Sequence, residues 1–225
     1  WCYPDNVAWV GPRFGANISL DRSIDTPFSD EELEQLSFIG PAMNEGFGQN
    51  ACAVNRVGAE QALAVQADFR DMLDVLSKHL TQHPFLLGNR PCLADFALAG
   101  AIKAHFITDP VPKSWLGQYE AMLTQYTESF FTDDAIEAGA WCDDDKLPDS
   151  VASIVNYLAR TYFVSSSANI AAGLAGEKFY EYDIGYGVAR ARTARRLNQA
   201  RLHVKDELNL VNAAQDPSVR TLLEE

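Results

Sequence analysis

The sequence predicts an all-α fold, a bundle of helices, and three features indicate it. Residues 59–80 carry apolar side chains at helical spacing, and Pro84 follows where such a helix would end. Residues 93–106 repeat this spacing, with small residues along one face. Strand-like alternation of apolar and charged residues is confined to residues 179–184, and one such segment cannot form a sheet.

The first fifty residues predict short elements. Pro4-Asp5-Asn6 would begin a short helix that Gly15 would end. Residues 29–32 have a capping-box pattern, in which a hydroxyl and a carboxylate three residues later each accept the other residue's backbone N–H. Because Gly40-Pro41 interrupts the apolar residues that follow, we expect one kinked helix or two short helices up to about residue 50.

The two strongest helical patterns are expected at the centre of the fold. Helix 59–80 has one stripe, apolar except for Gln66: Ala62, Leu63, Gln66, Phe69, Met72, Leu73, Leu76 and Leu80. Helix 93–106 has a stripe of mostly small residues: Phe96, Ala97, Gly100, Ala101 and Ala104. Small side chains let another backbone approach closely, so we expect this second stripe to face the core.

Further helices are predicted at residues 115–131, 149–164 and 191–211. Between the last two, residues 177–190 are expected to form an extended strap, because Tyr180, Tyr182 and Ile184 need to bury one face. We expect this strap to cross the open end of the bundle and to face residues 1–14. The prediction is therefore a helical domain over residues 1–135, with a helical extension over residues 136–225 packed on it.

Composition and charge limit the classes of function. The chain has 225 residues, of which 47% are hydrophobic and 22% charged, and this is typical of a globular protein with a core. The formal net charge is -13, which repels phosphate backbones and anionic lipids, so neither nucleic acid nor a membrane is an expected partner. The arginines of residues 190–201 are interpreted as a solvated helix face.

The four cysteines predict neither disulfides nor a metal site. Cys2, Cys52, Cys92 and Cys142 are widely spaced, without a CxxC pair or metal-ligand spacing to a histidine. We therefore expect reduced thiols, a cytoplasmic location and no metal. Trp1 is not a natural start residue, so we also expect further residues before it.

Residues 84–96, Pro-Phe-Leu-Leu-Gly-Asn-Arg-Pro-Cys-Leu-Ala-Asp-Phe, closely resemble a stretch of the glutathione transferases. In that family it joins the fifth helix of the C-terminal domain to the buried sixth helix. Residues 100–112 resemble a bacterial branch of the same family. The resemblance implies a helical bundle of the glutathione-transferase C-terminal type with an additional C-terminal helical extension.

In the family, a Ser or Thr caps the sixth helix, and an Asp three residues later returns the hydrogen bond. The matching positions are Cys92 and Asp95, which we interpret as a structural cap rather than as catalytic groups. A thiol is a weak acceptor, so Cys92 weakens the cap by about 1 kcal/mol relative to Ser.

The resemblance also implies an upstream partner. In the family, a thioredoxin-like domain comes first, binds glutathione and supplies the residue that stabilises the thiolate. The sequence shows no β-α-β units, so we expect that domain to be missing and the catalytic residue to have no position here. Glutathione would be the cosubstrate of the intact protein, and a homodimer is possible.

The helical domain of the family contributes a hydrophobic site for the acceptor substrate. One wall corresponds to Tyr3, Trp9, Arg13 and Phe14, and the second wall to Tyr180, Tyr182 and Arg192. Aromatic walls with one or two cations suit a flat electrophilic or anionic molecule. The alternative is that these aromatic residues are core packing, and the sequence favours neither interpretation for the cluster as a whole.

Two functions follow from this sequence. The first is the acceptor-binding half of a glutathione-dependent transferase, which would work by holding the thiolate and the acceptor together. The second is a non-catalytic helical interaction module in a larger assembly, because a fold alone does not decide function.

Overall fold

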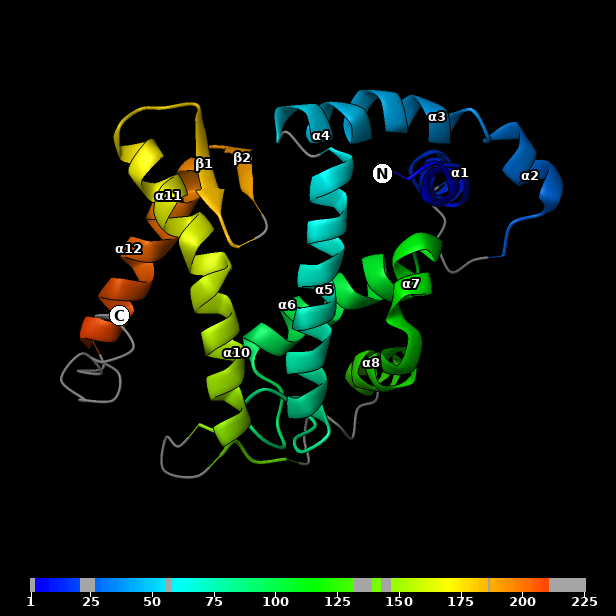
Figure 1. Ribbon diagram of the computed structural model, residues 1–225. Helices are drawn as coiled ribbons and strands as arrows, with labels where there is room; N and C mark the ends of the chain where they lie inside the picture. Colours follow the sequence, from blue (N-terminus) through cyan, green and yellow to red (C-terminus); the bar gives the residue numbers. More distant parts are fainter. Residues whose placement is uncertain are drawn as a thin grey trace. The chain divides into compact units, whose positions relative to one another are not determined.

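The computed structural model describes residues 3–20, 27–55, 58–131, 139–142, 147–185 and 187–210. Its internal contacts divide the chain into two compact units, Trp1–Leu158 and Ala159–Glu225 (Figure 1). The sequence prediction placed the boundary at residues 135–136, which lie outside the described residues.

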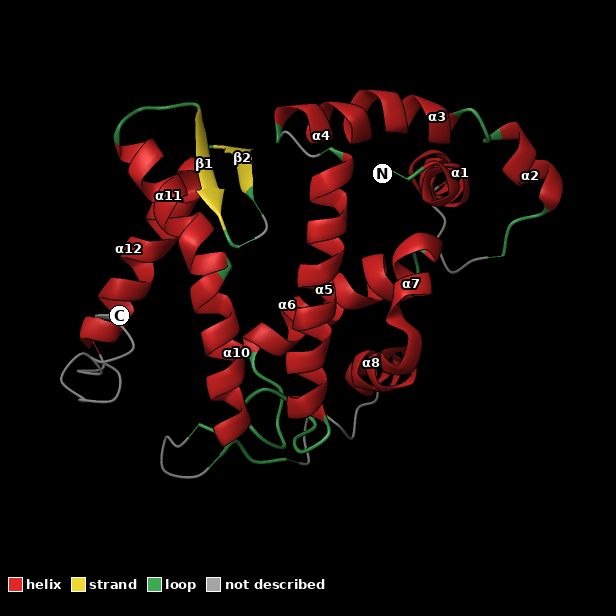
Figure 2. Cartoon of the chain, viewed as in Figure 1, coloured by secondary structure: helices red, strands yellow, loops and turns green. Residues whose placement is uncertain are grey.

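The regular elements of the first unit are all helices among its described residues, and turns and loops join them (Figure 2). Its α-helices are α1 (Pro4–Leu20), α2 (Asp30–Gln35), α3 (Ile39–Met43), α4 (Asn50–Val54), α5 (Ala59–Leu80), α6 (Leu93–Ala101), α7 (Pro110–Leu116), α8 (Glu120–Glu128) and most of α10 (Asp149–Arg160). Single π-helical turns follow α3 (Asn44–Gln49) and α6 (Ile102–Ile107), and 3-10 turns flank α8 (Gly117–Tyr119 and Ser129–Phe131).

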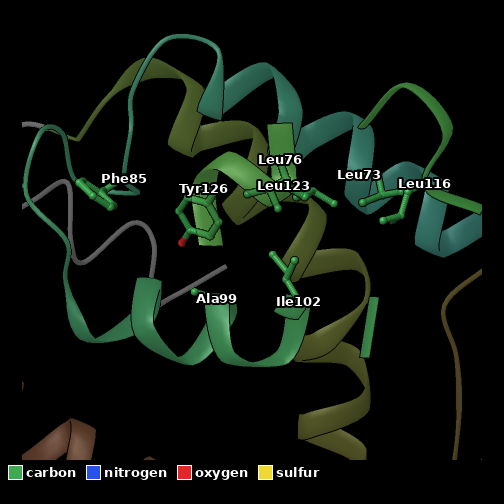
Figure 3. Close-up of a cluster of buried hydrophobic side chains, with 8 residues drawn as sticks. All are labelled: Leu73, Leu76, Phe85, Ala99, Ile102, Leu116, Leu123 and Tyr126. Carbon is green, nitrogen blue, oxygen red and sulfur yellow. The ribbon is translucent and has the colours of Figure 1, made fainter. Parts of the chain in front are cut away.

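The core of this unit forms where α5, α6, α7 and α8 meet (Figure 3). Its buried members are Leu73, Leu76, Phe85, Ala99, Ile102, Leu116, Leu123 and Tyr126. Helices α5 and α6 both contribute, which confirms the prediction that helices near 59–80 and 93–106 pack at the centre.

The small-residue stripe of α6 does not face this core, and that part of the prediction is wrong. Asp95, Ala99 and Ile102 are buried, whereas Phe96 is 44% exposed. A methyl group added at Gly100 would touch nothing within 4 Å. The buried carboxylate of Asp95 sets the rotation of the helix, because the face that carries it must point toward its hydrogen-bond donors.

Helix α1 is longer than predicted, because Gly15 serves packing rather than termination. Gly11 and Gly15 share one face of α1 and lie against Ile39 and Gly40 at the start of α3. A Cβ at Gly11 would overlap the Cα of Gly40, and a Cβ at Gly15 would overlap the side chain of Ile39. Glycine therefore lets the two backbones approach closely here.

Two predicted helices are broken in the structure. The helix expected over residues 115–131 is interrupted at Gly117, whose φ of 50° lies in the left-handed region that favours glycine. The helix expected over residues 149–164 ends at Arg160, and a new helix begins after Thr161. By contrast, the capping box at residues 29–32 is confirmed, since Ser29 N–H donates to Glu32 Oε2 at 2.8 Å and Glu32 N–H donates to Ser29 Oγ at 3.2 Å.

The second unit contains the end of α10, then α11 (Tyr162–Leu174), β1 (Phe179–Asp183), β2 (Val188–Arg192) and α12 (Arg195–Leu210). The sequence prediction treated residues 177–190 as a single extended strap. Instead, β1 pairs with β2 in an antiparallel hairpin, with Phe179 opposite Arg192 and Asp183 opposite Val188. This hairpin is the only sheet among the described residues, so the fold is all-α with a small two-stranded addition.

Gly11→Ala should destabilise the first unit by about 1–3 kcal/mol, because the added methyl group meets backbone that cannot move without separating α1 from α3. The matched control is Gly100→Ala, where open space and better helix propensity should stabilise by about 0.5–1 kcal/mol. Urea midpoints of both variants test this. A Gly11→Ala midpoint equal to that of the wild type would contradict the close approach.

Candidate functional site

The outer side of α1 carries a stacked cation and ring. The guanidinium of Arg13 lies 4.1 Å from the centre of the Trp9 ring, and Arg13 Nη1 donates to the Trp9 carbonyl at 2.9 Å. Burial lowers the pKa of Arg13, but arginine stays protonated in proteins. Both side chains are half-buried, so part of the pair remains accessible to solvent. Because the guanidinium lies over the ring, this part of the helix surface is flat and positively charged.

A chain of aromatic rings lies next to the start of α1. Tyr3 packs edge-on against Trp115 of α7 with ring centres 5.3 Å apart, and Trp115 lies 6.1 Å from Phe69 of α5. Phe69 in turn packs edge-on against Phe106 at 4.7 Å. The Tyr3 hydroxyl accepts a hydrogen bond of 3.4 Å from Gln66 Nε2. Tyr3 therefore has the contacts of a packing residue, although its ring remains half-buried.

Three of the four predicted residues of this wall lie on α1, where they occupy two faces, and Tyr3 precedes the helix. Trp9 and Arg13 are four residues apart and share one face, while Phe14 lies about 100° further round the helix and is 36% exposed. The helix itself is fixed by the buried Asn6, whose amide donates to Asp109 Oδ2 and whose carbonyl accepts from Val111 N–H, both at 3.2 Å. The Trp9–Arg13 pair is thus held on a rigid element.

The predicted second wall is divided by the hairpin. Alternate residues of a strand point to opposite faces, so Tyr180 and Tyr182 share one face and Arg192 lies on the other. The two tyrosine rings stack at 5.6 Å, and the Tyr180 hydroxyl lies 3.1 Å from Ser165 Oγ of α11. On the other face, Arg190 stacks over Phe179 at 4.0 Å. The tyrosines therefore pack toward α11.

The two predicted walls belong to different units of the chain, residues 3–14 to the first and residues 179–192 to the second. An acceptor site formed by both walls together stays a prediction, and so does the expectation that residues 177–190 face residues 1–14.

The predicted cap at the start of α6 is part of a buried network. The carboxylate of Asp95 is fully buried and accepts three hydrogen bonds: from Leu86 N–H at 2.8 Å, from Cys92 N–H at 2.9 Å and from the Tyr126 hydroxyl at 2.9 Å. Burial first, and then the charge of Asp95, raise the pKa of Tyr126, so the phenol remains a donor. Sequence reasoning found Asp95 but not Tyr126, because nothing in the spacing of α8 marks its partner.

The same environment makes Cys92 a poor nucleophile. Burial, and next the hydrogen bond with Asp95, raise the pKa of the Cys92 thiol. The reactive form of a cysteine is the thiolate, which a raised pKa disfavours. Burial and the neighbouring carboxylate therefore favour the protonated thiol at the start of α6.

A buried histidine completes the region before α6. His79 is fully buried. Its Nε2 lies 3.0 Å from the Phe85 carbonyl oxygen, and its Nδ1 lies 2.8 Å from Ser150 Oγ. A neutral ring protonated on Nε2 satisfies both contacts. Burial lowers the pKa of His79, which agrees with that neutral state. His79 lies seven residues after Met72, at the edge of the apolar stripe of α5, but a histidine does not by itself mark a buried position in the sequence.

Among the described residues, no group of three or more His, Cys, Asp or Glu side chains is arranged to hold a metal ion. Within the same parts of the chain, no helix combines the length and the apolar character needed to cross a membrane.

The capped α6 and the helices packed around it form an all-helical core, and α1 carries a cation–ring pair. Residues 41–133 match the family model described as glutathione S-transferase, C-terminal domain. This segment is therefore similar to the C-terminal domain of the glutathione S-transferases. Comparisons with curated proteins and with solved structures gave no match.

Asp95→Ala should destabilise the first unit by about 3–5 kcal/mol, because three buried donors lose their acceptor. Tyr126→Phe should cost about 1–3 kcal/mol, since it removes one hydrogen bond to a charged group. Tyr119→Phe is the matched control, because its hydroxyl donates to Asp74 at the exposed surface. Urea midpoints give the comparison, and equal shifts for Tyr126→Phe and Tyr119→Phe would contradict the buried network.

Stability should fall as the pH is lowered through about 6.5, the ordinary pKa of an unfolded histidine. The lowered pKa of folded His79 means that the unfolded chain binds the proton first, so acid favours unfolding. The urea midpoint of His79→Gln should change less between about pH 7.5 and 5.5 than that of the wild type. Matched replacement of the exposed His105 should leave the wild-type pH dependence intact. Identical pH profiles for His79→Gln and the wild type would contradict the assignment.

Proposed function

We propose that this chain supplies the acceptor-binding half of a glutathione S-transferase-like protein. The glutathione site would lie on a thioredoxin-like domain upstream, in a cytoplasmic protein that forms a homodimer. The chain would bind a hydrophobic small molecule and present it to the glutathione thiolate. Holding two reactants together in this way is a large source of rate enhancement.

The Trp9–Arg13 pair is the observation that supports this proposal best. It lies on α1, the helix that packs against α3 and bonds to the start of α7 through Asn6. Most of α3 and all of α7 fall within residues 41–133, which match the family. A flat acceptor with an acidic group would stack beside the ring and pair with the guanidinium.

A specific observation favours the second candidate function, a helical interaction module. The outer face of α6 is apolar and open, with Leu93 85% exposed and Phe96 44% exposed. Exposed apolar patches often mark surfaces that contact another protein or domain. The two candidates differ in their need for Arg13, because an interaction face on α6 has no use for a cation on α1.

Titration with a nitrobenzoate, followed by NMR, tests the acceptor site. Arg13→Ala should weaken binding roughly threefold to tenfold, the loss of an interaction worth about 1 kcal/mol. Arg90→Ala is a matched control, because Arg90 stacks on Trp141 at 4.9 Å in a second cation–ring pair far from α1 in sequence. Equal weakening by both variants, or no binding by the wild type, would contradict the acceptor site.

Glutathione itself should not bind this chain at micromolar concentrations, since its site is proposed to lie on the upstream domain. Calorimetry with glutathione alone provides the measurement. Micromolar binding would contradict the proposal that glutathione binds to the upstream domain. It would not affect the test of the acceptor site, which uses a different ligand.

A further inference from the structure

A groove lies between α11 and α12 in the second unit, outside the residues that match the family. Two hydrogen bonds join the helices at one end: Asn169 Nδ2 donates to the Ala194 carbonyl at 3.1 Å, and Ala194 N–H donates to Asn169 Oδ1 at 2.7 Å. From this point the two helices lie side by side in opposite chain directions, so the groove extends toward the start of α11 and the end of α12. The groove between them has a volume of about 590 Å³, within the range of small-ligand sites.

The walls of the groove are mostly apolar and open to solvent. Ile170 and Leu197 lie nearer the hydrogen-bonded end, and Tyr162 and Phe163 line the part contributed by the start of α11. Tyr162 is 52% exposed, Phe163 50% and Val204 55%. A concave surface with this much exposed apolar area gains free energy when a hydrophobic chain covers it.

Two cations line the α12 side of the same groove. Arg201 and Lys205 are four residues apart, so they project from one face of the helix. The guanidinium of Arg201 is oriented by Asn198, whose Oδ1 accepts from Nε at 3.2 Å and from Nη2 at 3.1 Å. Across the groove, α11 contributes the hydroxyl groups of Ser166 and Ser167. In a chain with a net charge of -13, two cations beside an apolar surface select an anion with a hydrophobic tail.

We propose that this groove binds a single-chain amphiphile with an anionic head group, of the fatty-acid carboxylate class. The acyl chain would lie along the apolar walls of α11 and α12, and the carboxylate would pair with Arg201 and Lys205. This site is distinct from the acceptor site, because no residue that lines the groove belongs to either predicted wall.

Calorimetric titration of the whole chain with decanoate tests the proposal. The wild type should bind decanoate more tightly than decanol, although the alcohol is the more hydrophobic of the two, because only the carboxylate meets the cations. Affinity should rise along the series from octanoate to dodecanoate, by up to roughly fourfold for each methylene that becomes fully buried.

Matched variants separate the groove from general charge effects. Arg201→Glu with Lys205→Glu should weaken decanoate binding by about tenfold or more, since two attractions become repulsions. Arg195→Glu with Arg196→Glu makes the same change of net charge on the same helix, at positions that do not line the groove, and should have a small effect. Val204→Asp should weaken binding more than His203→Asp, its neighbour outside the groove. Circular dichroism of each variant confirms that its helices are intact.

Three results would overturn the proposal: no binding of decanoate by the folded wild type, equal affinity for decanol, or equal losses from the two pairs of charge reversals. Arg13→Ala should leave decanoate binding unchanged. Failure of the acceptor site therefore leaves this result intact, and the reverse also holds.

Discussion

The fold of the first unit depends on one buried charge, the carboxylate of Asp95. A charge is stable away from water only when its oxygens accept enough hydrogen bonds, and here the donors are Leu86 N–H, Cys92 N–H and the Tyr126 hydroxyl. These donors come from the turn before α6, from the helix start itself and from α8. One group therefore fixes the path of the turn, the rotation of α6 and the distance to α8 together.

The position of α1 depends on a different constraint, the near contact of two backbones. Gly11 of α1 lies directly against Gly40 of α3, so a side chain at position 11 would push the two helices apart. The buried Asn6 then bonds to Asp109 and Val111 and prevents rotation about the contact. Because α1 is held at both places, these contacts fix the rotation of the helix and thereby the direction in which Trp9 points.

Local patterns were predictable from the sequence, and long-range choices were not. The capping box at residues 29–32 and the cap at Asp95 depend on residues three apart, so spacing alone reveals them. The face of α6 depends on Tyr126, which lies thirty-one residues away in sequence. Strand β2 was missed because its alternation of alanine and arginine lacks the large apolar residues that mark a strand. The acceptor site needed the arrangement of two units, which no local pattern contains.

The two proposed ligand surfaces would let an acidic chain select anions. At physiological ionic strength, charges are screened beyond about 8 Å, so the net charge of -13 matters less at a binding site than the cations in direct contact with the ligand. Both proposed surfaces offer a cation, and they differ in the shape of the apolar surface beside it. Arg13 lies flat on a single ring, which suits a planar molecule. Arg201 and Lys205 border an elongated groove between two helices, which suits a chain. Selectivity between the two surfaces therefore follows from shape, while charge is common to both.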